Sequence, residues 1–375
     1  MKTYEPVIGA AFIQDQAEWP NLMVRAGIRL DYFDPNSVLP SDLANPANSI
    51  DGAPPSPLVS TSKKVAVSPR LGIAYPIEDY AALHFAYGHF RQYPPLGDMF
   101  TNADYSVLST LQAGTVDYGV LGNPDVKPEE TVQYEFGYKH AINPNFGIDV
   151  TAFYKDVRSL LGVEFIETYN GAEYARLTNV DFGDVFGFTV STDQRHVGPA
   201  TISLDYTWQQ AMGNSSDPRE TATRAEAGED PKPRLVPLNW DQRHTFNATV
   251  ALSRPNVYSV SAVLKVASGQ PYTPAAESGF GQGLATNSGR KPNGAILDLR
   301  TEKMVGMWGQ RVGVFARVFN AFDTRYFNGM VFSSTGDPYY SRFPQADEVT
   351  LADPTRFYPP RRLEFGVRIG SEGMQ

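Results

Sequence analysis

The segment LMVRAGIRLDY, residues 22–32, decides the fold that the sequence predicts. Its even positions are apolar, whereas Arg25, Arg29 and Asp31 occupy odd positions. Successive side chains of a β-strand point to opposite faces, so this pattern gives one apolar face and one charged face. Such an alternation is typical of a strand that separates two different media. We therefore predict a β-strand here, with one side in water.

The same alternation recurs along almost the whole chain. Clear examples are residues 131–139, 146–155, 180–191, 201–209, 245–253, 258–266 and 361–370, with shorter versions near 7–17, 66–76, 81–91, 296–303 and 310–319. With residues 22–32 they make about thirteen strands of roughly ten residues, the length that crosses a bilayer at a tilt. The sequence therefore predicts an all-β, antiparallel chain.

Two architectures use strands of this kind. One is a soluble sandwich with one wet face, and the other is a transmembrane β-barrel, in which only every second residue must be apolar. Charges in the middle of the polar faces favour the barrel, because a wide watery lumen accommodates them. Aromatic residues near strand ends on the apolar face also favour it, because they suit the girdles at a membrane interface. These aromatic residues are Tyr32, Tyr75, Tyr87, Tyr138, Tyr154, Trp208 and Tyr258.

The composition excludes several other classes of protein. No apolar stretch reaches the roughly 20 residues of a membrane-spanning helix. The net charge of −9 argues against a nucleic-acid partner. The chain has no cysteine, so neither a disulfide framework nor a thiolate site can form.

Short and long connections alternate between the predicted strands. The long ones cover residues 35–64, 93–130, 158–173, 212–241, 269–293 and 320–359, and the connections between them are short turns rich in Pro, Asn and Gly. Outer-membrane barrels have short periplasmic turns and long extracellular loops. This order makes the first and last strands run in the same direction. A closed single-chain bacterial barrel needs an even number of strands, so we expect further strands to precede these residues.

Five sequence blocks resemble the C-terminal part of TonB-dependent outer-membrane receptors. They are NPDVKPEE at 123–130, YEFGY at 134–138, SPRLGIAYP at 68–76, FNAFDTRY at 319–326 and RRLEFGVR at 361–368. The blocks are fairly specific in combination, and the resemblance covers nearly the whole chain. The sequences RAGIRLDYFDPN at 25–36 and SPRLGIAYPI at 68–77 are most similar to those of large receptors with a carboxypeptidase-regulatory-like N-terminal module.

The resemblance implies a bacterial outer-membrane location and a 22-stranded barrel, of which residues 1–375 would be the C-terminal part. It implies a receptor and transporter, not an enzyme, for a nutrient such as a ferric siderophore, an oligosaccharide or a peptide. The implied partners are outer-membrane lipid and that ligand, with TonB reached only through an N-terminal part, and no nucleic acid. The plug domain and TonB box of the family have no counterpart here. The usual terminal aromatic residue is replaced by residues 370–375.

Chemistry-bearing motifs are scarce. The five histidines, His84, His89, His140, His196 and His244, lack metal-ligand spacing, and we predict no catalytic residue, metal site or cofactor. The aromatic and arginine residues of the long loops are the candidates for ligand binding, unless they only pack the loops together. They are Arg91, Tyr93, Phe100, Tyr105, Tyr118, Phe332, Tyr339, Tyr340, Arg342 and Phe343. The alternatives are a soluble or surface-bound all-β binding or adhesion protein, and an outer-membrane enzyme.

Overall fold

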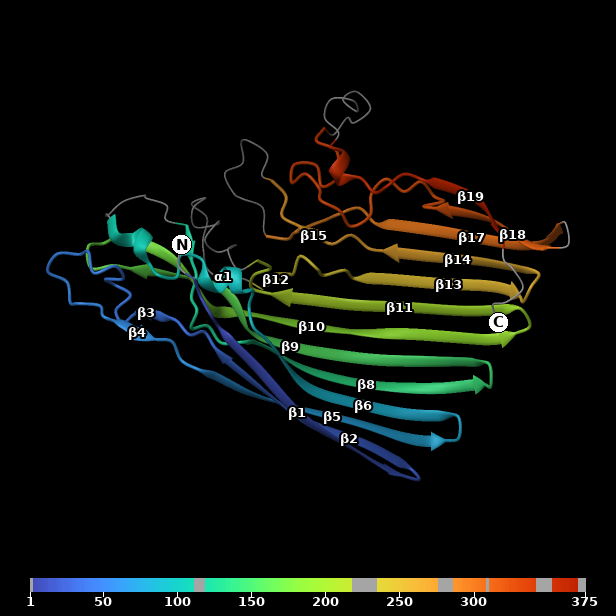
Figure 1. The fold of residues 1–375 in the computed structure, drawn as a ribbon, viewed down its shortest axis with the longest axis horizontal. Helices are drawn as coiled ribbons and strands as arrows, with labels where there is room; N and C mark the ends of the chain where they lie inside the picture. The colour runs from blue at the N-terminus through green and yellow to red at the C-terminus, as the bar shows by residue number, and fades with distance from the viewer. Residues whose placement is uncertain are drawn as a thin grey trace.

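Thirteen strands form one continuous antiparallel sheet in the computed structural model, which describes residues 3–110, 119–217, 235–275, 286–307, 310–341 and 353–369 (Figure 1). In order they are β1 (Val7–Trp19), β2 (Leu22–Asp34), β5 (Lys64–Glu78), β6 (Ala81–Gln92), β8 (Glu129–Asn143), β9 (Phe146–Glu167), β10 (Glu173–Val197), β11 (Ala200–Gly213), β13 (His244–Arg254), β14 (Tyr258–Ala267), β17 (Gly294–Met307), β18 (Gln310–Phe319) and β19 (Arg362–Ile369). The predicted all-β antiparallel architecture is confirmed, and each predicted strand has its counterpart.

Smaller elements lie in the connections. Strand β3 (Val38–Pro40) pairs with β4 (Leu58–Ser60), and β15 (Pro271–Tyr272) pairs with β16 (Gly289–Arg290). Strand β7 (Val120–Leu121) adds to β10, and β12 (Val236–Pro237) adds to β11. The helical segments are α1 (Leu96–Phe100), η1 (Ser106–Thr110) and η2 (Pro354–Arg356). Among the described residues, no helix is long and apolar enough to cross a membrane.

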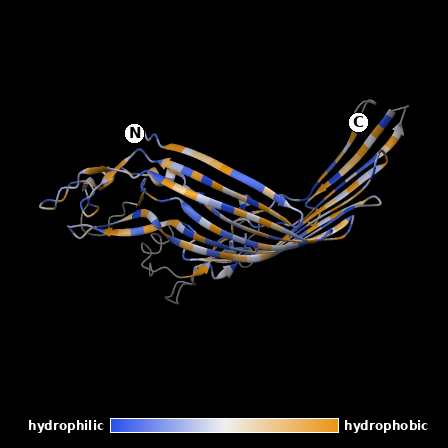
Figure 2. Cartoon of the chain, turned by 90° about the horizontal axis from the view of Figure 1, so that it is seen from below, coloured by the Kyte–Doolittle hydropathy of each residue, from blue (hydrophilic) through white to orange (hydrophobic). Residues whose placement is uncertain are grey.

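The register aligns side chains of one kind into rows that cross the sheet. One row on the apolar face runs from β6 to β17 through Leu83, Tyr138, Val150, Val190, Tyr206, Phe246, Val266 and Ala295. The adjacent row on the polar face contains His84, Gly137, Thr151, Thr189, Thr207 and Thr245. A slip of one residue would exchange the two faces, so the apolar pattern fixes the register. Figure 2 shows the resulting alternation along the strands.

The two ends of the sheet differ as predicted. Short turns join β1 to β2, β8 to β9 and β10 to β11 at one end, which lies on the right in Figure 1. The long connections gather at the other end, where β3, β4 and α1 lie. We call this end the mouth of the sheet.

One predicted loop was wrong. Residues 158–173 are mostly strand, because β9 continues to Glu167 and β10 begins at Glu173. The run Leu160–Ile166 is apolar on both faces, so it lacks the period of two by which we recognised strands. At the mouth end of this hairpin, Leu161, Val163 and Leu177 are buried in a cluster with loop residues. Two register shifts, at Asn179/Asp181 and Asp181/Gly183, let the hairpin bend toward those loops.

The sheet is open in the part of the chain that the structure describes. There, β1 pairs only with β2, and β19 pairs only with β18. Because thirteen strands alternate in direction, β1 and β19 run the same way. An antiparallel closure between them is therefore impossible.

Candidate ligand-binding site at the mouth

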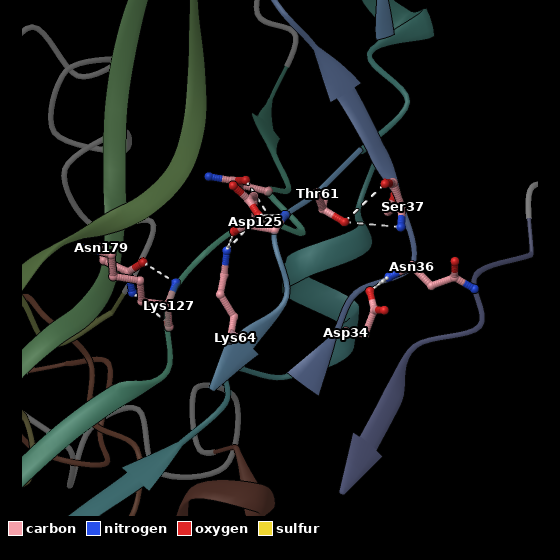
Figure 3. A network of polar contacts seen from close by, with 10 residues as sticks. Asp34, Asn36, Ser37, Thr61, Lys64, Asp125, Lys127 and Asn179 are labelled. Carbon is pink, nitrogen blue, oxygen red and sulfur yellow. Dashed lines mark hydrogen bonds and ion pairs between the residues drawn. The ribbon is translucent and has the colours of Figure 1, made fainter. Parts of the chain in front are cut away.

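The block NPDVKPEE at 123–130 forms a clamp that joins several segments at the mouth of the sheet (Figure 3). One carboxylate oxygen of Asp125 accepts hydrogen bonds from the Ser62 backbone N–H at 2.7 Å and the Ser62 hydroxyl at 2.8 Å. The same oxygen lies 2.6 Å from Lys64 Nζ. Asn123 Oδ1 accepts from the Asp125 backbone N–H at 3.0 Å, which holds the turn that presents the carboxylate. The clamp thus joins the start of β8 to the start of β5.

The second half of the clamp reaches the tall hairpin of β9 and β10. The Asn179 side chain accepts from the Lys127 backbone N–H at 2.7 Å and donates to the Lys127 carbonyl at 3.0 Å. It also donates to the Ser159 carbonyl at 2.8 Å. Glu129 accepts from the Leu161 backbone N–H at 3.2 Å. Four strands therefore have their mouth ends fixed by one loop segment.

Acid is expected to loosen this clamp. Partial burial would raise the pKa of Asp125, but hydrogen bonds from Lys64 and Ser62 outweigh burial and hold the pKa below its ordinary value of 3.8. Stabilisation by a carboxylate with a lowered pKa is present above its unfolded-state pKa and disappears as the pH falls through the folded-state pKa. We expect amide hydrogen-exchange protection of residues 122–128, corrected for intrinsic rates, to drop below about pH 4.

The variant Asp125→Asn is the matched control for this acid effect. Its protection should be low already at neutral pH and should not fall further through that acid step. Equal acid sensitivity in both proteins would contradict the role of Asp125.

Two buried clusters stabilise the loops above the clamp. The first contains Phe33, Met99, Val126, Leu161, Val163 and Leu177, and the second contains Leu39, Tyr105, Leu108, Leu121, Ala172 and Tyr174. Each cluster combines loop residues with the extended ends of β9 or β10. The loops on this side are therefore packed structures, attached to the hairpin by apolar contacts.

Three predicted ligand-binding aromatics lie in or against these clusters. Tyr105 is fully buried, and its hydroxyl donates to the Gly122 carbonyl at 3.4 Å. This burial raises the pKa of Tyr105. Tyr93 packs its ring 4.4 Å from Phe33, and Phe100 packs its ring 4.5 Å from Tyr4. Their rings contribute to loop packing, the alternative that the sequence left open.

Arg91 lies on the apolar face of β6, two residues beyond His89 and four beyond Tyr87. Its guanidinium is 2.8 Å from Glu130, which also lies 2.7 Å from His89 Nδ1. The structure therefore places Arg91 at the outside of the sheet. It occupies an ion-paired position just above the ring pair Tyr87 and Tyr134, whose centroids are 5.2 Å apart.

The last loop carries an exposed aromatic surface at the mouth. Tyr340 is 57% exposed, and its ring meets Phe332 edge-on at 5.5 Å. The Arg356 guanidinium lies 3.8 Å from the centroid of Phe332. Tyr339 packs against Phe357 at 5.1 Å. The predicted residues Arg342 and Phe343, like Tyr118, lie outside the described residues.

Two arginines of this loop were missed by the sequence analysis. Arg325 donates to the Tyr339 hydroxyl at 3.4 Å, and Arg356 covers Phe332. Both follow or precede aromatic residues within the same loop, which is the signal that could have found them. We call Arg325, Phe332, Tyr339, Tyr340 and Arg356 the aromatic–arginine platform. Flat rings and guanidinium groups together can stack on a planar ligand, and Arg325, which is exposed, can bind an anionic group, whereas Arg356 already lies 3.5 Å from Asp353.

Within the described ranges, no group of three or more His, Asp or Glu side chains could hold a metal ion.

Comparison with known proteins agrees with this architecture. The family described as "TonB dependent receptor-like, beta-barrel" matches residues 2–321. No curated protein sequence matches the chain. Several solved structures share the fold at low identity, among them the ferric-catecholate import receptor Fiu from E. coli K12, with 16% identity and a TM-score of 0.55. That alignment covers 96% of this chain and 44% of the receptor.

Two further structures are similar to the same degree. A mutant of the ferric enterobactin receptor PfeA from Pseudomonas aeruginosa aligns with 18% identity and a TM-score of 0.59, over 96% of this chain and 44% of that one. The siderophore receptor PiuA from Acinetobacter baumannii aligns with 14% identity and a TM-score of 0.57, over 96% and 43%. The chain thus spans less than half of the length of these structures.

Proposed function

This chain belongs to the family of TonB-dependent receptor β-barrels of the bacterial outer membrane, and on that premise we propose that it forms part of the wall of an outer-membrane receptor for a small nutrient ligand. One observation carries the proposal. The sheet presents an unbroken apolar row from β6 to β17 on one face and a polar, threonine-rich row on the other. A single-layered sheet needs two such faces where it separates lipid from water.

The ligand that we propose is a ferric siderophore. Three structures with the same fold are receptors for a ferric catecholate, for ferric enterobactin and for a siderophore. The aromatic–arginine platform supports the same class, because such complexes combine flat rings with negative charge. Oligosaccharides and peptides are the other ligands that the sequence suggested.

We further propose that residues 1–375 are the C-terminal part of a larger barrel. Support comes from β1 and β19, which run in the same direction and are each paired on one side within the described residues. Further strands beyond β1 would supply the antiparallel partners that a closed barrel needs. Coupling to TonB would then involve the remaining part of the receptor.

Membrane fractionation tests the proposal. The chain is expressed behind a bacterial signal peptide, and the cells are separated into periplasm, inner membrane and outer membrane. We expect the chain in the outer-membrane fraction, released only by detergent. Recovery as a folded periplasmic monomer that stays monodisperse without detergent would overturn the proposal and favour a soluble all-β binding protein.

Neighbouring residues of β14 provide a matched pair of variants. Ala262 lies on the apolar face opposite Val250, whereas Ser261 lies on the polar face opposite Ala251. A lysine on the lipid face near the bilayer centre costs about 2–4 kcal/mol. We therefore expect Ala262→Lys to reduce the inserted fraction and Ser261→Lys to leave it near the parent level.

A further inference from the structure

A hollow lies on the polar face of the sheet, away from the mouth. It is about 310 Å³ in volume and spans β1, β2, β5, β6 and β8. Its floor contains Gly27, Gly72 and Gly88, and its walls include Arg25 and Arg70. We call it the glycine–arginine hollow. It shares no residue with the clamp or with the aromatic–arginine platform.

The register explains why this part of the sheet is hollow. Arg70 stands between Gly27 on β2 and Gly88 on β6, and Arg25 stands opposite Gly72 on β5. The Gln14 side chain and the Phe90 ring lie close to the glycines on either side of Arg70, whereas the space opposite Arg25 is open. The space above Gly72 could hold a side chain, because a Cβ there would meet nothing closer than 3.9 Å.

Neutral groups hold both arginines in place. Gln16 Oε1 accepts from Arg25 Nε at 3.0 Å and from Arg25 Nη2 at 2.6 Å. The guanidinium carbon of Arg70 lies 4.9 Å from the ring centroid of Phe90. These contacts orient the charged groups without neutralising them. In the part of the chain that the structure describes, neither arginine forms an ion pair, whereas Arg29 on the same face lies 2.9 Å from Asp31.

The net charge of the hollow is positive. Glu135 is the acidic residue of its lining, and this carboxylate accepts a hydrogen bond from Gln133. Lys155 stands opposite Gln133 on β9 and adds a further positive charge nearby. Arg25 and Arg70 are diagonal neighbours on adjacent antiparallel strands, so their like charges repel each other. An anion placed between them would relieve that repulsion.

We propose that the glycine–arginine hollow binds a carboxylate or phosphate group of a small anionic solute. Guanidinium forks match both groups with paired, charge-assisted hydrogen bonds. The amide of Gln14, which also lines the hollow, adds a neutral donor. The site lies on the wall of the sheet below the mouth, so it would contact an anion after that anion has passed the loops.

Calorimetric titration of the full chain in maltoside micelles tests the site, with citrate and inorganic phosphate as separate probes at low ionic strength. Citrate represents carboxylates, and the uncharged detergent does not compete. We expect at least one probe to bind to the parent chain. The double variant Arg25→Gln/Arg70→Gln should bind that probe at least about tenfold more weakly. Added salt should weaken binding to the parent chain.

A second variant separates a shaped site from general attraction to positive charge. Gly72→Val keeps both arginines but fills the hollow, and valine suits a strand. We expect it to lose binding like the double variant. The matched controls are Arg254→Gln, at the last residue of β13, and Gly9→Val, where a Cβ would meet nothing within 4 Å. Both should bind like the parent chain.

Two results would overturn the inference. One is no binding of either probe by the parent chain, and the other is equal binding by the parent chain, the double variant and Gly72→Val. The inference rests on the proposed function for the route by which an anion reaches the hollow, but its readout is anion binding by the purified chain. If the chain failed to reach the outer membrane, the titration would still show whether the hollow binds an anion.

Discussion

Replacing Asp241 with alanine is expected to lower the free energy of unfolding by about 3 kcal/mol. Asp241 is fully buried, between β12 and β13. Its Oδ2 lies 2.8 Å from Arg243 Nε and 2.6 Å from Arg290 Nη2, and its Oδ1 accepts from the Ala211 backbone N–H at 2.8 Å. Removal of the carboxylate leaves two cations and one buried N–H without this acceptor.

The size of this effect follows from the exposure of the partners. Losing one member of a buried ion pair costs about 3–5 kcal/mol when the remaining charge stays buried. Here the side chains of Arg243 and Arg290 are 30% and 36% exposed, so water can solvate them partly. We therefore expect the lower end of that range.

Denaturant unfolding in micelles, followed by tryptophan fluorescence, measures the change. Asp241→Asn should be intermediate, because it retains an oxygen for Ala211 but loses the charge. Asp193→Ala, at an exposed position of β10, is the matched control and should change stability by less than about 0.5 kcal/mol. If Asp241→Ala were no less stable than Asp193→Ala, the anchoring role would be refuted.

Sequence periodicity predicted the strands because each strand has one apolar face and one polar face. Residues such as Val150 and Thr151 are adjacent in sequence but belong to different rows of the sheet. The same rule failed at Leu160–Ile166, where loop residues cover Leu161 and Val163 on one face and Glu164 pairs with Arg176 on the other. Apolar residues then occur at both odd and even positions, and the period of two is lost.

The site was less predictable, because aromatic residues serve both packing and binding. Tyr105 and Tyr340 are both loop tyrosines, yet Tyr105 is fully buried and Tyr340 is 57% exposed. Only tertiary contacts decide between these roles. The clamp shows the same limit, since Asp125 finds its partners at Ser62 and Lys64, about sixty residues earlier in the chain. The NPDVKPEE motif could be recognised in the sequence, but its role in joining strand ends at the mouth could not.

The base of the last loop depends on one side chain, and Asn320→Ala is expected to lower the free energy of unfolding by about 3–4 kcal/mol. Asn320 is 2% exposed. It donates to the carbonyls of Thr324 and Pro359 at 2.9 Å each and accepts from the Thr324 N–H at 2.9 Å. Contact with Pro359 closes the loop between β18 and β19. Without this side chain, three backbone groups, two of Thr324 and one of Pro359, lose their hydrogen-bond partner.

Backbone conformation adds a second, smaller cost at the same position. Asn320 has a φ of 50°, in the left-handed region that alanine disfavours by about 1 kcal/mol. Asn320→Gly accepts that conformation but still loses the side chain. The difference between the alanine and glycine variants therefore measures the backbone cost, and the loss they share measures the hydrogen bonds.

Asn256, in the turn between β13 and β14, provides the matched control. It has a φ of 59°, but it is exposed and forms no side-chain hydrogen bond within the described part of the chain. Asn256→Ala should thus lower the free energy of unfolding only through the unfavourable backbone conformation, by about 1 kcal/mol. Denaturant unfolding gives both values, and equal losses at Asn320 and Asn256 would show that the loop base is not held by this side chain. Because Arg325, Tyr339 and Tyr340 lie within the same loop, we expect hydrogen exchange of the aromatic–arginine platform to rise in Asn320→Ala and to stay unchanged in Asn256→Ala.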